Sequence, residues 1–183
     1  MALTGLVAAG ALRGLDRAIL DLVQDPHAAW LDVAGSAITI LGQSEVVGTV
    51  ALGVAIVRRR AGRADWWVPL ALAAVVALEV ALKLTVAQAP PPHELSRSLA
   101  LIPFIESPLR NAFPSGHLAR VAFMVTALRW PGWTAPVAVL LMAITRVYLA
   151  EHWPSDVLGG WLLGYGVATI AIASSPAGKR AVR

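Results

Sequence analysis

Long apolar stretches dominate this sequence and constrain its fold more than any other feature. Hydrophobic residues make up 57% of the 183 residues and charged residues only 14%, whereas about a quarter of an average soluble domain is charged. A helix needs roughly 20 mostly apolar residues to cross a bilayer. Five apolar stretches are long for core helices of a soluble domain this small, although the third is shorter than a usual span: Val33–Val57, Trp66–Ala89, His117–Trp130, Thr134–Ala150 and Ser155–Ser175. We therefore predict an all-α integral membrane helical bundle with about five transmembrane helices, forming a single domain over residues 1–183.

Composition also excludes several kinds of protein. The chain has no cysteine, which rules out disulfides, thiolate metal sites and cysteine nucleophiles. Its net charge is +4, but the basic residues cluster at the ends of apolar stretches. That placement indicates orientation in the bilayer and contact with anionic lipid, and it argues against nucleic acid as a partner.

The basic residues predict the orientation of the bundle. Arginines lie between the first two spans (58–63) and between the third and fourth (Arg129), and the C-terminal tail 176–183 is basic. With five spans these three places share one side, which the positive-inside rule makes cytoplasmic. The proline-rich loop 91–114 then lies outside. We expect a multi-pass protein of the inner (plasma) membrane whose outer ends face the periplasm or the cell exterior.

The apolar part of residues 1–30 is too short to span a bilayer. Charged residues from Arg13 to Asp25 alternate with leucines and isoleucine, a spacing that favours an amphipathic helix lying in the membrane interface. A cleaved signal peptide is a lesser alternative, because no basic segment precedes the apolar one.

Ionisable residues gather at the predicted outer ends of the spans. Lys83 lies in the last turns of span two, Ser115-Gly116-His117 opens span three, and Arg146 lies near the end of span four. His152 follows, and Asp156 begins span five. Free N–H groups at a helix start and two cations suit an anion such as phosphate. Ionisable residues within spans are costly, so we interpret this group as a functional site.

Each of these residues also has a simpler interpretation when it is taken alone. Lys83 could extend to lipid headgroups, and Asp156 could complement the dipole of its helix. Glu79 precedes Lys83 by four residues, an order that favours an ion pair, so it either positions Lys83 or merely neutralises it. Four glycines of span five permit close helix packing. Core contact is favoured over a dimer seam there, which leaves a homodimer open: Gly159, Gly160, Gly164 and Gly166.

The order and spacing of these motifs resembles the three-part signature of the type 2 phosphatidic acid phosphatase family of membrane lipid phosphatases, over about residues 75 to 170. Lys83 is followed by six residues and then Pro90-Pro91, where the family has Arg-Pro. Thr145-Arg146 stands for Ser-Arg, and we expect the first of the six spans that are common in the family to be absent. Arg97 or Arg110 is a candidate for replacing the absent arginine.

The resemblance implies a mechanism. His152 would attack phosphorus and form a phosphohistidine, Asp156 would fix the His152 tautomer, and His117 would protonate the leaving group. No metal or cofactor is implied. The remaining motif residues would stabilise the phosphate oxygens: Lys83, Ser115, Gly116 and Arg146.

The resemblance also implies a substrate class. A lipid phosphate or diphosphate fits, with a polyprenyl diphosphate such as undecaprenyl diphosphate favoured, because an outward site and a small chain suit the recycling of such carriers. Phosphatidylglycerophosphate and phosphatidate remain open. One alternative is a catalytically weak member of the family that binds lipid or assists assembly. Another is a vanadate-dependent haloperoxidase, which the membrane-like composition disfavours.

Overall fold

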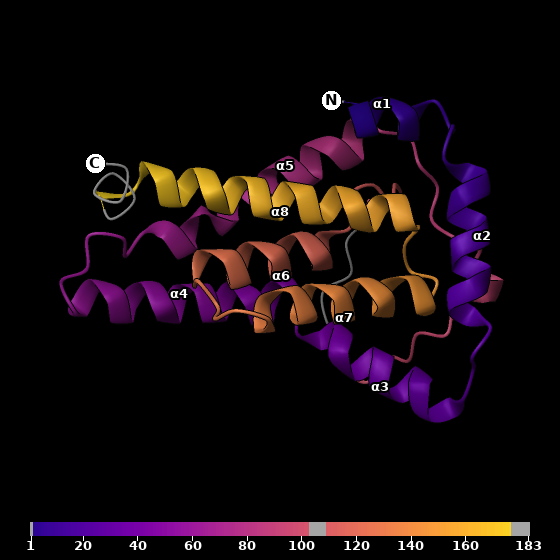
Figure 1. The fold of residues 1–183 in the computed structure, drawn as a ribbon, viewed down its shortest axis with the longest axis horizontal. Coiled ribbons are helices and arrows are strands. Elements are labelled where there is room, and N and C mark those ends of the chain that lie inside the picture. Colours follow the sequence, from indigo (N-terminus) through magenta and orange to yellow (C-terminus); the bar gives the residue numbers. More distant parts are fainter. Residues whose placement is uncertain (1, 103–108, 177–183) are drawn as a thin grey trace.

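A computed structural model describes residues 2–102 and 109–176, and every regular element in those ranges is a helix (Figure 1). The all-α prediction is confirmed for them. Most of the predicted tail 176–183 and the centre of the loop 91–114 lie outside the described residues. The elements are α1 (Ala2–Ala8), α2 (Arg13–Gln24), α3 (Ala29–Ile40), α4 (Ser44–Arg60), η1 (Val68–Ala71), α5 (Leu72–Thr85), η2 (His93–Leu95), α6 (Gly116–Ala127), α7 (Thr134–Tyr148) and α8 (Pro154–Ser174).

All five apolar stretches contain helices, but these helices differ in length. In the described part of the chain, two helical segments are long and apolar enough to cross a membrane, Val68–Thr85 and Pro154–Ser174. The bent pair α3 and α4 makes a third if it counts as one span. The helices α6 and α7 have 12 and 15 residues. The number of five spans therefore stays a prediction.

The first predicted span is not one continuous helix. It is divided between α3 and α4, whose axes differ by 42°. Gly42 lies at the break, and a Cβ there would lie 2.9 Å from Cδ2 of His117. Among the described residues, the carbonyl oxygen of Gly42 makes no helical hydrogen bond at this break. It accepts a hydrogen bond from Nε of Arg120 at 2.9 Å instead. The break coincides with the polar residues Gln43, Ser44 and Glu45, which interrupt the apolar stretch in the sequence, whereas the contact with Arg120 is visible only in the structure.

Helices α6 and α8 form the most extensive helix pair of the bundle. A Cβ added to Gly160 would collide with the carbonyl oxygen of Ser115, and one added to Gly164 with that of Ala119. Only glycine allows the two backbones to approach so closely at these positions. The preference for core contact over a dimer seam is confirmed for Gly160 and Gly164, and for Gly159, where a Cβ would collide with the ring of Phe113. Gly166 has nothing within 4 Å.

The N-terminal helix α2 lies across the end of the bundle where α8 begins (Figure 1). Its amphipathic character is confirmed, but part of its apolar face packs on protein. Leu20 is fully buried in a cluster that includes Leu118 and Met142. Leu15 and Leu22 are exposed. Its location in the membrane interface stays a prediction.

The arrangement of the helix ends leads to a topology test. The arginine-rich turn after α4 and the turn between α6 and α7 lie at the end of the bundle opposite α2 (Figure 1). Arg60 and Ser98 are both exposed, and the chain has no cysteine. We expect an impermeant thiol reagent to label Ser98→Cys in intact cells and Arg60→Cys only after permeabilisation. Labelling of position 60 in intact cells would contradict the predicted orientation.

Candidate active site

His152 and Asp156 form a buried pair at the start of α8. Asp156 is the third residue of the helix, and its Oδ2 accepts a hydrogen bond from the backbone N–H of Trp153 at 2.9 Å. The same oxygen lies 3.4 Å from Nδ1 of His152. Asp156 is completely buried and His152 is 7% exposed. The helix start therefore fixes the carboxylate, and the carboxylate faces one ring nitrogen of the histidine.

The short segment that carries His152 is tightly held. The backbone N–H groups of Glu151 and His152 both donate to the carbonyl oxygen of Arg146, at 3.1 and 3.2 Å. Burial is the main reason that the pKa of the His152 imidazole lies well below its usual value, and the positive charges of Arg146 and Lys83 lower it further. A neutral imidazole whose Nδ1 faces a carboxylate is suited to act as a nucleophile through its other nitrogen.

The start of α6 is joined directly to the start of α8. The backbone N–H of Ser115 donates to the carbonyl oxygen of Asp156 at 2.9 Å. A Cβ on Gly116 would collide with the Glu79 carboxylate, so this carboxylate lies against the first turn of α6. The second and third motifs thus meet through the backbone, which places His117 at the same end of the bundle as His152.

Glu79 on α5 lies between two cations. Its Oε1 is 3.6 Å from Nζ of Lys83, and its Oε2 accepts a hydrogen bond from Nη1 of Arg120 at 2.9 Å. The predicted pair of Glu79 and Lys83 is confirmed as an ion pair. Since Arg120 also donates to Gly42, this cluster connects α5, α6 and the break between α3 and α4.

Arg146 enters the site from the last turn of α7 and is 6% exposed. Its Nη1 donates to Oγ1 of Thr39 at 2.6 Å, and its Nη2 lies 3.6 Å from Oε2 of Glu151. Its Nε is buried and has no hydrogen-bond partner among the described residues. The guanidinium is thus oriented by two neighbours while one of its donors is left unused.

The predicted residues come together at one end of the bundle. Lys83, Arg146 and His152 are all close enough to act electrostatically on His117, and Lys83 acts in the same way on Asp156. In the described part of the chain, four buried polar atoms here have no hydrogen-bond partner: Ser115 Oγ, His117 Nε2, Arg146 Nε and Asp156 Oδ1. Buried polar groups are nearly always paired. Three of these atoms, on Ser115, His117 and Arg146, can donate a hydrogen bond, and unpaired donors beside buried cations are typical of a site for an anion; Oδ1 of Asp156 only accepts.

Several residues of this region were missed by the sequence analysis. Arg120 is an ionisable residue in an apolar stretch, the same signal that singled out Lys83, and it could have been found. Asp16 and Gln24 gave no such signal, because their partners are remote in sequence. Asp16 accepts hydrogen bonds from the N–H and Oγ of Ser155 at 2.8 and 2.7 Å. Gln24 donates to the carbonyl oxygen of Tyr148 at 2.7 Å. These contacts attach α2 to both sides of the His152 segment.

Replacement of the missing arginine by Arg97 or Arg110 stays a prediction. Nη1 of Arg97 is 3.4 Å from the Tyr148 hydroxyl, and its guanidinium lies 5.4 Å from the centre of that ring. Arg110 is exposed.

Over residues 2–102 and 109–176, no group of three or more histidine or acidic side chains could hold a metal ion.

The helical bundle and its apolar spans define a multi-pass membrane protein with a buried cluster of ionisable residues at one end. A family model described as the PAP2 superfamily matches residues 64–180, which is more than half of the chain. The chain belongs to the PAP2 superfamily.

Two curated relatives match shorter segments. The undecaprenyl-diphosphatase of Sulfolobus acidocaldarius is 31% identical over 70 residues, which are 36% of this chain and 34% of the relative. The putative undecaprenyl-diphosphatase YbjG of Escherichia coli is 36% identical over 66 residues, 33% of each chain. The aligned segments thus span about a third of the curated relatives.

Two solved structures share the fold. A transmembrane PAP2 type phosphatidylglycerolphosphate phosphatase from Bacillus subtilis superposes with a TM-score of 0.77 at 22% identity, covering 93% of this chain and 89% of that one. Aquifex aeolicus LpxE gives a TM-score of 0.68 at 22% identity, covering 86% of this chain and 94% of that one. At this identity the likeness concerns the fold alone.

Proposed function

We propose that this protein is a membrane phosphatase that hydrolyses a lipid phosphate or diphosphate on the outer side of the plasma membrane. One observation carries the proposal: the His152–Asp156 pair lies among buried cations and unpaired donors at the end of the bundle. Such a site can neutralise phosphate oxygens and offers a neutral imidazole to phosphorus.

The geometry suits a two-step reaction. Nε2 of His152 attacks phosphorus, the bond from phosphorus to the leaving oxygen breaks, and His117 gives that oxygen a proton. Water, deprotonated by His117, then attacks the phosphohistidine and releases phosphate, which restores His152. Asp156 holds Nδ1 of His152 and balances the positive charge of the imidazolium. The oxygens of the transition state are stabilised by Lys83, Ser115, Gly116 and Arg146.

A polyprenyl diphosphate is the favoured substrate. Two relatives carry the name undecaprenyl-diphosphatase, and an outward site suits the recycling of a lipid carrier. Phosphatidylglycerophosphate is the second choice, because a structural neighbour is a phosphatidylglycerolphosphate phosphatase.

The test is release of phosphate by the purified protein in detergent. A panel of undecaprenyl diphosphate, phosphatidylglycerophosphate and phosphatidate should show turnover, highest on the first. A protein that binds these lipids but releases no phosphate from any of them would instead support the alternative of a catalytically weak, lipid-binding member, which the uncharged Pro90 motivates.

Metal removal gives a further prediction. Because the proposed mechanism neutralises phosphate oxygens with Lys83, Arg146 and helix N–H groups, we expect EDTA to leave the activity within about twofold of its starting value. Vanadate should inhibit, since it adopts the five-coordinate geometry of the transition state. Loss of activity in EDTA with recovery in magnesium would contradict the proposed mechanism in favour of metal-assisted hydrolysis.

A further inference from the structure

Arg120 on α6 forms a buried ion pair that the proposed reaction does not use. Its Nη1 donates to Oε2 of Glu79 and its Nε donates to the carbonyl oxygen of Gly42, both at 2.9 Å. Arg120 is 6% exposed and Glu79 is 9% exposed. A buried ion pair contributes little net stability, because both charges lose their hydration. Stability alone therefore does not account for this pair, which lies beside the candidate active site.

One hydrogen bond of Arg120 leads to the ring of His117. Gly42, whose carbonyl oxygen Arg120 holds, lies against this histidine: a Cβ on Gly42 would be 2.9 Å from Cδ2 and 3.2 Å from Cα of His117. The ring atom bonded to Cδ2 is Nε2, which is buried and has no hydrogen-bond partner among the described residues. The backbone at Gly42 thus limits how the His117 ring can turn, and Arg120 holds that backbone in place.

The other hydrogen bond of Arg120 leads to Lys83. Oε1 of Glu79 is 3.6 Å from Nζ of Lys83, and the Glu79 carboxylate lies against Gly116 at the first turn of α6. Because Arg120 binds the second carboxylate oxygen, Glu79 is fixed between two cations. Arg120 also shares the negative charge of Glu79, so Lys83 keeps part of its positive charge for a phosphate group.

We propose that Arg120 is a positioning residue, which fixes the ring of His117 through Gly42 and fixes Lys83 through Glu79. The inference rests on the proposed function, in which His117 gives a proton to the leaving oxygen. The two contacts have different consequences for the reaction. A loosely held His117 slows the departure of a basic leaving group, whereas a loosely held Lys83 weakens the stabilisation of phosphate oxygens for every substrate.

The test compares a lipid monophosphate, phosphatidate, with nitrophenyl phosphate, whose acidic leaving group needs no proton. The measure is kcat/KM, because it reports formation of the phosphoenzyme, the step in which the leaving group departs. Arg120→Gln should lower kcat/KM roughly 10²-fold for phosphatidate, since a small misplacement of a catalytic group has an effect of this size. The loss for nitrophenyl phosphate should stay below about tenfold.

Two further variants separate the contacts of Arg120. Arg120→Lys keeps the charge beside Glu79 but not the planar fork, so it should restore activity on nitrophenyl phosphate and leave phosphatidate hydrolysis reduced. Gly42→Ala should reproduce the selective loss on phosphatidate, because its methyl group would displace the His117 ring. Recovery of both substrates in Arg120→Lys would show that charge suffices and would contradict the role of the contact with Gly42.

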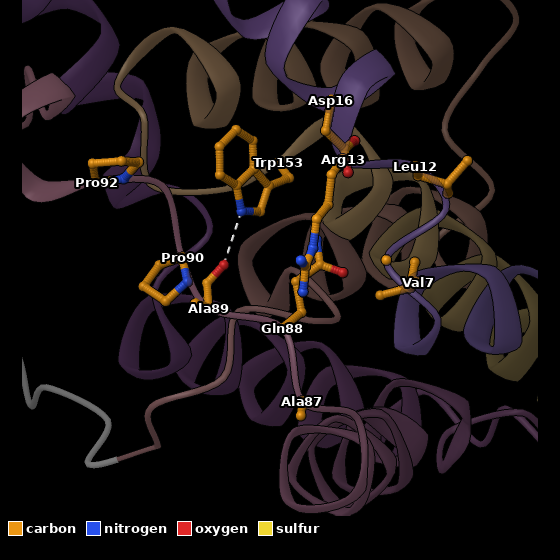
Figure 2. Close-up of a pocket in the computed structure, with 11 residues that line it drawn as sticks. Val7, Leu12, Arg13, Asp16, Ala87, Gln88, Ala89, Pro90, Pro92 and Trp153 are labelled. Carbon is orange, nitrogen blue, oxygen red and sulfur yellow. Dashed lines mark hydrogen bonds between the residues drawn. The ribbon is translucent and has the colours of Figure 1, made fainter.

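Two other arginines provide controls. Arg58 lies in the last turn of α4, at the opposite end of the bundle, and its Nη1 is 3.5 Å from Oδ2 of Asp65. Arg13 is exposed and lines a cavity of about 310 Å³ between the N-terminal helices and the segment that follows α5 (Figure 2), and neither His117 nor Arg120 lines this cavity. Arg58→Gln and Arg13→Gln should each change the ratio of the two kcat/KM values by less than about twofold.

A measurement without turnover uses the histidines themselves. The chain has four of them, so the ring nitrogens of His117 can be resolved by NMR in protein labelled with nitrogen-15 histidine and assigned with His117→Ala. Arg120→Gln and Gly42→Ala should both shift the His117 resonances, because each changes what the ring packs against. The two control variants should leave these resonances in place.

The outcomes separate this inference from the proposed function. Equal losses on both substrates in Arg120→Gln, or unchanged His117 resonances in that variant, would overturn the positioning role. If Arg120→Gln does not fold, Arg120→Lys decides by the same comparison of substrates. A wild-type protein that releases phosphate from neither substrate would overturn the proposed function instead, and the His117 resonances would then still decide whether Arg120 holds the ring.

Discussion

Replacing His152 by alanine should abolish turnover and the covalent phosphoenzyme together. In the proposed mechanism its ring nitrogen forms the bond to phosphorus. We expect kcat to fall by roughly 10⁴-fold or more, since removing a nucleophile eliminates the reaction path itself. The measurement is rapid quenching into base with radiolabelled substrate, because phosphohistidine is labile in acid. A His152→Ala protein that still forms the adduct would show that another residue is the nucleophile.

His117→Ala supplies the contrasting variant, because a general acid matters only as much as its leaving group needs a proton. Hydrolysis of a lipid monophosphate, whose alkoxide is strongly basic, should fall by about 10²–10⁴-fold. Nitrophenyl phosphate, with its acidic leaving group, should retain relatively more activity. Asp156→Asn should lie between the two histidine variants, since the amide keeps the shape but no longer balances the imidazolium charge. Equal impairment of His117→Ala on both leaving groups would mean that the assigned roles are wrong.

Gly164→Ala should destabilise the bundle although it adds a single methyl group. That group would collide with the carbonyl oxygen of Ala119 and lie 2.9 Å from the backbone nitrogen of Phe123. Because backbone atoms of a helix cannot rotate away, α6 and α8 would have to separate. Overpacking of this kind costs roughly 3 kcal/mol, which should lower the midpoint of thermal unfolding in detergent by roughly 5–10 °C.

The same helix offers the control. Gly166→Ala adds the same methyl group where nothing lies within 4 Å, and alanine is the better helix former. Its midpoint should equal that of the wild-type protein or exceed it slightly. The Gly164 variant should also lose activity, since α6 begins with the residues that face His152. Identical midpoints for the two variants would show that the close approach of α6 and α8 does not limit stability.

Fold class and the motif residues followed from the sequence because both depend on local order along the chain. Apolar stretches near the length of a bilayer predicted helices, and all five stretches contain them. His152 and Asp156 are four residues apart across the start of α8, so their contact is local. Glu79 and Lys83 are also four residues apart, which is one turn of α5. The ion pair of Glu79 and Lys83 was predicted from this spacing, and the structure contains it.

Long-range contacts were decided by the tertiary structure alone. The break at Gly42 depends on Arg120, which lies 78 residues away, and the attachment of α2 depends on the contact of Asp16 with Ser155, 139 residues away. The polar residues Gln43, Ser44 and Glu45 mark an interruption beside Gly42 but name no partner for it, and a helix spacing pattern gives an acidic residue a face but no partner. Such contacts arise only when helices pack, because the hydrogen-bonding capacity of a buried group is satisfied by whatever neighbour packing brings. The sequence thus determined which residues could make the site, and packing decided which of them face one another.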